Sequence, residues 1–279
     1  MTRVTVRDFG EWKSQGRKFA CVTAYDAPSA RIAAAAGIPL ILVGDSLGNA
    51  VLGYKNTLPV TLDEMLHHAK AVRRGAPDGF VVGDLPFLSY QVSVEQALES
   101  TGRFVKEGGV DAVKLEGGRA VSESVRRIVE MGVPVMGHLG LTPQSTHRFG
   151  GFRVQGTTAA AAVELLEDAQ RLADAGAFSI VIECVPERVA AAVASRVSVP
   201  VIGIGAGVGC DGQILVWNDV IGIESEVKPR FVRRYAEVEA VIRGALERFV
   251  ADVGEGAFPG HEESFRMSDD EWSEFQKSL

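Results

Sequence analysis

Eight short, almost continuously apolar segments recur along this chain, and helical patterns separate nearly all of them. The segments lie at 19–25, 39–44, 79–84, 110–116, 134–139, 178–183, 200–205 and 213–217. Strands that are apolar on both faces are typical of parallel sheets covered by helices. Eight is the number of strands that closes a (β/α)8 barrel, so the sequence predicts a TIM barrel, with an open doubly wound sheet as the alternative.

Helix start signals fall between these segments at the expected places. Thr61 followed by Glu64 predicts a capping box, and Ser93 followed by Gln96 predicts a second one. Between the seventh and eighth strands the sequence leaves room only for a short link. Near the end of the chain, a helix is expected over 231–253.

The length of 279 residues suits a single barrel, which commonly takes about 250 residues. The sequence changes character at Lys228, where the alternation of strands and helices stops. We therefore expect one domain over 1–279, with 228–279 as a C-terminal helical extension that packs on the barrel or on a neighbouring subunit.

The net charge of −7 disfavours binding to nucleic acid, and no run of Lys and Arg interleaved with aromatic residues is present. Cys21, Cys184 and Cys210 are odd in number and widely spaced, which suits a reducing compartment. The sequence has neither a signal peptide pattern nor an apolar stretch long enough for a bilayer. A cytoplasmic protein that binds neither membranes nor nucleic acids is expected.

Polar residues stand at the carboxyl ends of five consecutive predicted strands. They are Asp45 and Ser46, Asp84, Lys114 and Glu116, His138, and Glu183. Each has a structural explanation when taken alone: an Asp caps a loop, and Lys114 and Glu116 share a strand face and suit an ion pair. Because the carboxyl ends of barrel strands meet at one rim, where chemistry occurs, we expect the whole set to converge.

Three carboxylates on adjacent strands repel one another, and one lysine does not balance them. Carboxylate oxygens are ligands that Mg²⁺ prefers, with water and substrate completing its octahedron. Zinc is disfavoured because no Cys/His cluster accompanies these acids. The sequence therefore predicts a Mg²⁺ site formed by Asp45, Asp84 and Glu116.

A metal ion with open positions at a barrel rim can chelate a 2-oxo acid and stabilise the enolate formed on removal of the neighbouring proton. Glu183 is distant in sequence from the metal carboxylates and is the candidate base. Lys114 supplies fixed positive charge for the developing enolate oxygen.

The chain resembles the ketopantoate hydroxymethyltransferase family, also called the 3-methyl-2-oxobutanoate hydroxymethyltransferases, over essentially its full length. The resemblance rests on Val-Gly-Asp-Ser-Leu-Gly at 43–48, Asp-Leu-Pro-Phe-Leu-Ser-Tyr at 84–90, Val-Lys-Leu-Glu-Gly-Gly at 113–118 and Gly-His-Leu-Gly-Leu-Thr-Pro-Gln at 137–144. Further matching segments lie at 23–26, 57–65, 150–156 and 203–207.

This resemblance implies a barrel of the phosphoenolpyruvate/pyruvate type, assembled as a homo-oligomer and often as a decamer. It implies transfer of a one-carbon unit from 5,10-methylenetetrahydrofolate to 3-methyl-2-oxobutanoate, which gives 2-dehydropantoate on the route to pantothenate. The enolate of the keto acid would be stabilised by Mg²⁺.

Position by position, the resemblance makes Asp45 and Asp84 direct Mg²⁺ ligands and Glu116 an outer or water-linked one. The keto acid is expected at Asp45, Ser46, Asp84 and Lys114, and Glu183 matches the proton acceptor. His138 has a supporting role in the same motif set. Two departures, Asn218 where the family often has His and Glu263 where it usually has His, put folate-side or tail packing in doubt.

Two other functions stay open on the sequence. A Mg²⁺-dependent carbon–carbon lyase acting on a 2-oxo acid is the main alternative, although the Lys-x-Cys-Gly-His context of such lyases is absent. A non-catalytic scaffold barrel predicts that Asp45 and Asp84 are dispensable. The glycines at 203–212 weakly suggest a phosphate site, but a tight turn also needs them.

Overall fold

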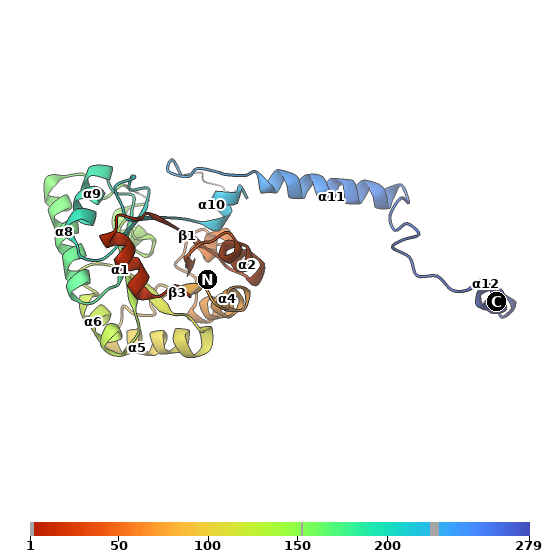
Figure 1. The fold of residues 1–279 in the computed structure, drawn as a ribbon, viewed down its shortest axis with the longest axis horizontal. Helices are drawn as coiled ribbons and strands as arrows, with labels where there is room; N and C mark the ends of the chain where they lie inside the picture. Colours follow the sequence, from red (N-terminus) through yellow and green to blue (C-terminus); the bar gives the residue numbers. More distant parts are fainter. Residues whose placement is uncertain (1–2, 152, 224–228) are drawn as a thin grey trace. The chain divides into compact units, whose positions relative to one another are not determined.

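The computed structural model describes residues 3–151, 153–223 and 229–279, and its first part is a closed barrel of eight parallel strands (Figure 1). The strands pair in sequence order, and β8 returns to pair with β1. They are β1 (Phe19–Thr23), β2 (Leu40–Val43), β3 (Phe80–Asp84), β4 (Ala112–Glu116), β5 (Val135–Gly140), β6 (Ser179–Glu183), β7 (Val201–Ile204) and β8 (Gly212–Leu215). The predicted fold is confirmed.

Helices follow β1 to β6 and cover the outside of the barrel (Figure 1). They are α2 (Ala27–Ala35), α4 (Leu62–Gly75), α5 (Val94–Arg103) with the π-helical turn η1 (Phe104–Gly108), α6 (Ser122–Glu130), α8 (Ala159–Asp174) and α9 (Glu187–Arg196). The capping box predicted for α4 is present: Thr61 Oγ1 accepts from Glu64 N, and Glu64 Oε2 accepts from Thr61 N. As expected, β7 and β8 are joined by turns without a helix.

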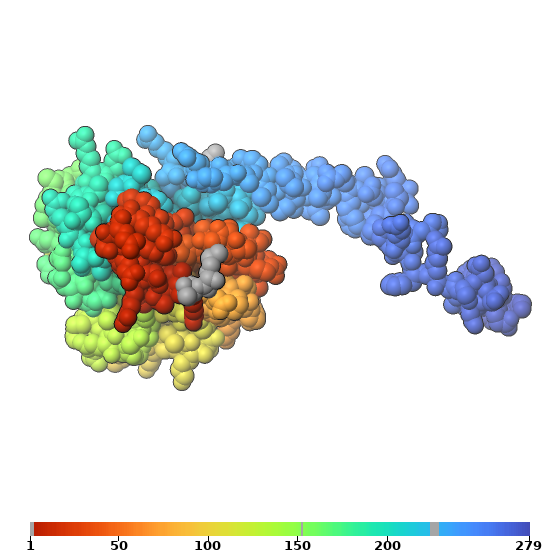
Figure 2. All heavy atoms as spheres, in the orientation of Figure 1, coloured from red at the N-terminus to blue at the C-terminus, as the bar shows by residue number. Residues whose placement is uncertain are grey.

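Helix α1 (Val6–Ser14), which the sequence patterns did not predict, packs against the amino end of the barrel. Phe9 is fully buried, and its ring centroid lies 5.4 Å from that of Phe19 and 5.2 Å from that of Phe80. Figure 2 shows this N-terminal segment, in red, on the barrel part. Aromatic packing therefore fills the amino end, and the opposite rim carries the polar strand ends.

The glycines at 203–212 are explained by close packing. A Cβ on Gly207 would lie 2.4 Å from Glu187 Cβ, and a Cβ on Gly212 would lie 2.7 Å from the Phe19 ring. Separations this short are not tolerated between carbon atoms, so these positions exclude larger residues for packing reasons. No phosphate site is needed to account for them.

The chain divides into two compact units. The barrel unit runs to Val220 and includes most of the short helix α10 (Trp217–Ile221), and a second unit occupies the C-terminal part from Arg234 to Leu279. The second unit contains α11 (Val238–Gly254) and α12 (Asp269–Lys277). Lys228, where the sequence changes character, lies outside the described residues, and so does Phe152 of the 150–156 segment.

Two local predictions were wrong. The helix expected over 231–253 begins only at Val238, because Arg233 and Arg234 place positive charge where a helix would present its own positive end. Ser93 caps α5 through Gln96 N, but the Gln96 side chain bonds Val92 N and Leu88 O, so no capping box forms.

The rim loops also hold short helices that the patterns did not predict. These are α3 (Leu47–Ala50), the 3-10 turn η2 (Pro143–Ser145) and α7 (Thr146–Phe149). In the described part of the chain, no helix is both long and apolar enough to span a membrane.

Candidate active site

The carboxyl ends of β2 to β6 bring the predicted polar residues into one cluster. Its most enclosed members are at most 5% exposed: Asp45, Asp84, Lys114, Glu116 and His138. Strand register explains the pairing, since Asp84 lies beside Lys114 on β3 and β4, and Glu116 lies beside His138 on β4 and β5. Neighbouring parallel strands thus place acids next to cations.

Lys114 forms an ion pair with Asp84, with 2.7 Å between Nζ and Oδ1. The sequence had suggested Glu116 as its partner on the same strand, but the adjacent strand supplies a closer acid. Burial by itself lowers the pKa of Lys114, yet the charges of Asp84, Glu116 and Asp45 outweigh burial and raise it. Lys114 therefore keeps its positive charge inside the barrel rim.

Asp45 follows directly on the end of β2 and is held from two sides. Its backbone N–H donates to Asp84 Oδ2 at 3.1 Å, and its own Oδ2 accepts from Gln144 Nε2 at 2.9 Å. Burial, followed by the charges of Asp84 and Glu116, raises the pKa of Asp45 well above its usual range. Burial also raises the pKa of Asp84, against the effect of Lys114. Keeping both carboxylates ionised and buried this close together costs electrostatic free energy, and a bound cation would lower that cost.

His138 connects two of the acids. Its Nδ1 lies 3.2 Å from Glu116 Oε1, and its Nε2 lies 3.2 Å from Glu183 Oε2. Burial and the charge of Lys114 lower the pKa of His138, but the two carboxylates outweigh them and raise it to about 9. The carboxylates on both sides thus favour the protonated imidazole, and His138 lies as a bridge between Glu116 and Glu183.

Glu183 ends β6 and keeps more contact with solvent than its neighbours, with 15% of its side chain exposed. Leu141 N donates to its backbone oxygen at 2.9 Å. A Cβ on Gly140 would lie 2.3 Å from that oxygen, and Gly140 has a positive φ of 86°, so only glycine fits there. Cys184, the next residue, also has a positive φ, 48°. The neighbouring strand β5 and the turn at Cys184 thus fix the position of the Glu183 backbone.

Ser46 directly precedes the short helix α3, makes no side-chain capping hydrogen bond to it and is only partly buried. Its Oγ lies 2.8 Å from the hydroxyl of Tyr25, at the end of β1. All seven predicted site residues therefore lie at neighbouring strand ends on one rim.

Gln144 is a site residue to which the sequence assigned no role. Its backbone N donates to Glu116 Oε2 at 3.0 Å, and its Nε2 donates to Asp45 and to Leu85 O. The Tyr90 hydroxyl donates to Gln144 Oε1 at 2.7 Å, which fixes the orientation of the amide. Gln144 closes one of the motif segments, but no spacing rule links it to acids 28 and 99 residues away.

The donor set fits an oxygen-liganded divalent cation. Four carboxylates face one lysine and one histidine. The buried oxygens Asp84 Oδ1 and Glu116 Oε1 have only Lys114 Nζ at 2.7 Å and His138 Nδ1 at 3.2 Å as charged neighbours among the described ion pairs. Within the ranges that the structure describes, no group of three or more His, Cys, Asp or Glu side chains has the arrangement of a complete metal site. Mg²⁺ needs only one or two carboxylates with water and substrate, so two carboxylates such as Asp45 and Asp84 would be enough to hold it.

The two departures from the family pattern have their own local contacts. Asn218 on α10 donates from Nδ2 to Ala50 O at 3.1 Å, so it ties α10 to the end of α3. Glu263 accepts from Gly260 N at 2.9 Å within the C-terminal unit. Neither residue has a hydrogen bond to the acids of the cluster.

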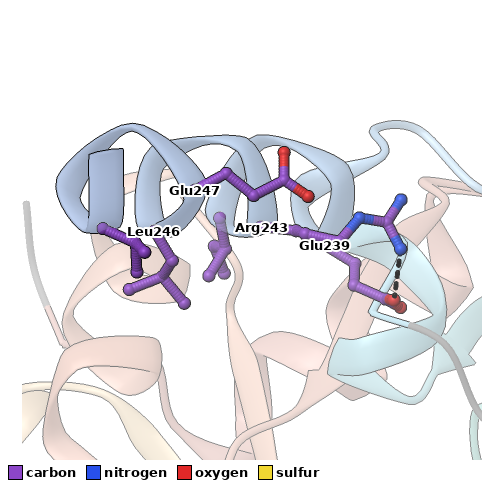
Figure 3. Close-up of a pocket in the computed structure, with 6 residues that line it drawn as sticks. Glu239, Arg243, Leu246 and Glu247 are labelled. Carbon is purple, nitrogen blue, oxygen red and sulfur yellow. Dashed lines mark ion pairs between the residues drawn. The ribbon is translucent and has the colours of Figure 1, made fainter. Parts of the chain in front are cut away.

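An apolar groove of about 440 Å³ lies on α11 (Figure 3). Ile242, Leu246 and Val250 form its floor, and the ion pair between Glu239 and Arg243 borders it. Its lining also includes Glu247, and half of the lining side chains are aliphatic, so the groove suits a packing surface rather than a reaction site.

A family model described as ketopantoate hydroxymethyltransferase matches residues 3–261. The 3-methyl-2-oxobutanoate hydroxymethyltransferase of Carboxydothermus hydrogenoformans is 53% identical over 268 residues, covering 96% of this chain and 97% of that protein. The protein of the same name from Thermotoga maritima is 56% identical over 254 residues, covering 91% of this chain and 94% of that protein.

Among solved structures, the barrel resembles a phosphonopyruvate hydrolase, with a TM-score of 0.61, 13% identity and coverage of 100% of this chain and 96% of that chain. It also resembles 2,3-dimethylmalate lyase, a member of the PEP mutase/isocitrate lyase superfamily, with a TM-score of 0.58, 15% identity and 98% coverage of both chains. At these identities the likeness concerns the fold alone. It agrees with the predicted phosphoenolpyruvate/pyruvate type of barrel.

Proposed function

The chain belongs to the ketopantoate hydroxymethyltransferase family, and we propose that the strand-end cluster of its barrel is the catalytic site. The enzyme transfers a hydroxymethyl group to 3-methyl-2-oxobutanoate in pantothenate synthesis. One observation carries the assignment of the site: the pair Asp84–Lys114 and the bridge Glu116–His138–Glu183 lie side by side at one rim.

We propose that Asp45 and Asp84 would hold Mg²⁺, with Glu116 as a more remote, water-linked partner. The buried carboxylates and their excess negative charge support this assignment. When bound, the ion would polarise the keto and carboxylate oxygens of the substrate. Gln144 occupies one oxygen of Asp45 and so limits how that carboxylate can turn.

The remaining side chains have separate tasks. Ser46 and Lys114 would hold the keto acid, and the fixed charge of Lys114 would stabilise negative charge that develops on the keto oxygen. Glu183 takes the proton from C3 of the keto acid, next to the carbonyl. His138 holds Glu183 in place from the side facing Glu116.

We propose 5,10-methylenetetrahydrofolate as the one-carbon donor. C3 of the deprotonated keto acid forms the new carbon–carbon bond to the methylene carbon, which separates from the folate nitrogens. Water supplies the hydroxyl group of the product and one proton to the folate. Glu183 returns the proton taken from C3, so both folate nitrogens are protonated when tetrahydrofolate and 2-dehydropantoate are released.

A direct assay separates this reaction from the lyase alternative. Purified protein with 3-methyl-2-oxobutanoate is expected to form 2-dehydropantoate only when methylenetetrahydrofolate is added. A folate-independent retro-aldol cleavage of a dicarboxylate would instead indicate a lyase. The proposed site is tested by Asp84→Asn, which is expected to lose the transferase reaction, with Asp63→Asn on the exposed side of α4 as a matched control.

We also propose that the protein is a homo-oligomer, and the decamer stays a prediction. Helix α11 supports this because several of its large apolar side chains are about half exposed or more, among them Val241, Leu246, Phe249 and Val250. A helix with this much exposed apolar area gains by packing against another copy of the chain. The cytoplasmic location also stays a prediction.

A further inference from the structure

Three hydroxyl groups and one backbone N–H are linked by successive hydrogen bonds, and this hydrogen-bonded chain ends at Ser46. Trp217 N, at the start of α10, donates to Thr23 Oγ1 at 2.9 Å. Thr23 Oγ1 donates to the Tyr25 hydroxyl at 2.9 Å, and that hydroxyl lies 2.8 Å from Ser46 Oγ. The chain joins the ends of β1, β2 and β8.

Counting protons gives this chain a direction. A backbone N–H can only donate, so Thr23 Oγ1 accepts from Trp217 and uses its own proton toward Tyr25. Tyr25 then accepts from Thr23. Among the hydrogen-bond partners of the Tyr25 hydroxyl in the described part of the chain, Ser46 Oγ is the group left to accept its single proton. Ser46 is therefore an acceptor toward Tyr25, and its own hydroxyl proton points elsewhere.

We propose that Tyr25 is a positioning residue that fixes the proton of Ser46 for donation to the keto acid. The inference rests on the proposed function, in which Ser46 contacts that substrate. A 2-oxo acid offers only oxygen acceptors to this side chain, so a serine held as a donor matches it and a serine free to rotate does not.

The surroundings of Tyr25 suit this role. Its side chain is 3% exposed, and burial raises the pKa of its hydroxyl to about 12, so the proton needed for the chain is retained. His68 Nδ1 donates to the Tyr25 backbone oxygen at 2.6 Å, which holds the residue from α4. The hydroxyl thus has a fixed position and a fixed donor direction.

The test uses the full-length protein with Mg²⁺ and measures the Kd of 3-methyl-2-oxobutanoate by titration calorimetry, together with kcat and KM. Tyr25→Phe is expected to raise Kd and KM by about 10-fold, the effect of one misdirected hydrogen bond, with kcat within about 3-fold. Thr23→Val is expected to do the same although the Tyr25 hydroxyl remains. Thr23→Ser, which keeps the hydroxyl, is expected to restore wild-type values.

Tyr54→Phe is the matched control, because it removes a hydroxyl that donates to Glu64 at 2.6 Å, outside the site. Wild-type Kd values for Tyr25→Phe and Thr23→Val, alongside a weakened Ser46→Ala, would overturn the inference and leave the proposed function intact. An effect of Tyr25→Phe without one of Thr23→Val would also overturn it, since Tyr25 would then act by contact alone. Wild-type affinity for the keto acid in Ser46→Ala would show that Ser46 does not contact the substrate. That result would overturn both this inference and the substrate contact in the proposed function. If Tyr25→Phe does not fold, the comparison of Thr23→Val with Thr23→Ser decides.

Discussion

Replacing Lys114 by methionine tests whether the rim is an electrostatically balanced cluster. Lys114 Nζ lies 2.7 Å from Asp84 Oδ1, and the two side chains are 4% and 1% exposed. At an effective dielectric constant of about 20, unit charges at that separation attract by about 6 kcal/mol before desolvation is counted. Removing one partner of such a buried pair costs about 3–5 kcal/mol of folding free energy, because the other charge stays buried.

The loss should depend on pH in a defined direction. Burial already raises the pKa values of Asp45 and Asp84 in the folded protein, and without Lys114 these values rise further. A carboxyl group with a raised folded-state pKa destabilises the protein as pH rises above its unfolded value, near 3.9. The stability difference between Lys114→Met and wild type is therefore larger near pH 8 than near pH 5.

Urea unfolding with EDTA, at a fixed protomer concentration, measures this difference. The double variant Lys114→Met/Asp84→Asn should regain most of the loss, since no unpaired charge remains at that position. Lys70→Met, which removes an exposed ion pair with Glu107 at 3.8 Å, is the control and should change stability by less than about 1 kcal/mol. The reasoning is refuted if Lys114→Met is as stable as wild type near pH 8, or if the double variant is no more stable than the single one.

Three further predictions concern the metal ion, the hydrogen bond from Gln144 to Asp45, and oligomer assembly. EDTA should abolish turnover and Mg²⁺ should restore it; full activity in chelator contradicts the metal assignment. Gln144→Ala should lower kcat/KM by about 10- to 100-fold and raise the Mg²⁺ concentration needed, because Asp45 loses its donor, whereas Gln170→Ala on exposed α8 should leave both unchanged. Leu246→Glu should reduce the particle mass in light scattering; an unchanged mass, or a monomeric wild type at micromolar concentration, contradicts the oligomer proposed through α11.

The barrel was predictable because its signals are local and repeated. Each strand is a short apolar run, and several helices start at a recognisable cap, such as Thr61 with Glu64. Helix α1 escaped prediction because its burial depends on Phe9 meeting rings from distant strands, such as Phe80. The start of α11 was misjudged because apolar periodicity does not report on charge at the helix end.

The membership of the cluster was also predictable, since parallel strands end at one rim. Its internal pairing was not. Lys114 could have paired with Glu116 on its own strand, but the register of β3 against β4 places Asp84 next to it. Gln144 was missed for a related reason: it reaches Asp45 only because the loop after β5 folds back over β2 and β4.

The exchange of the C3 proton of 3-methyl-2-oxobutanoate with solvent deuterium tests the account most directly, because it isolates proton abstraction from folate chemistry. Glu183→Gln keeps the size of the side chain and removes its charge. We predict that this variant binds the keto acid with a Kd within about 3-fold of wild type and exchanges the C3 proton at less than about 1% of the wild-type rate. Exchange at the wild-type rate would show that another base is responsible and would contradict the role assigned to Glu183.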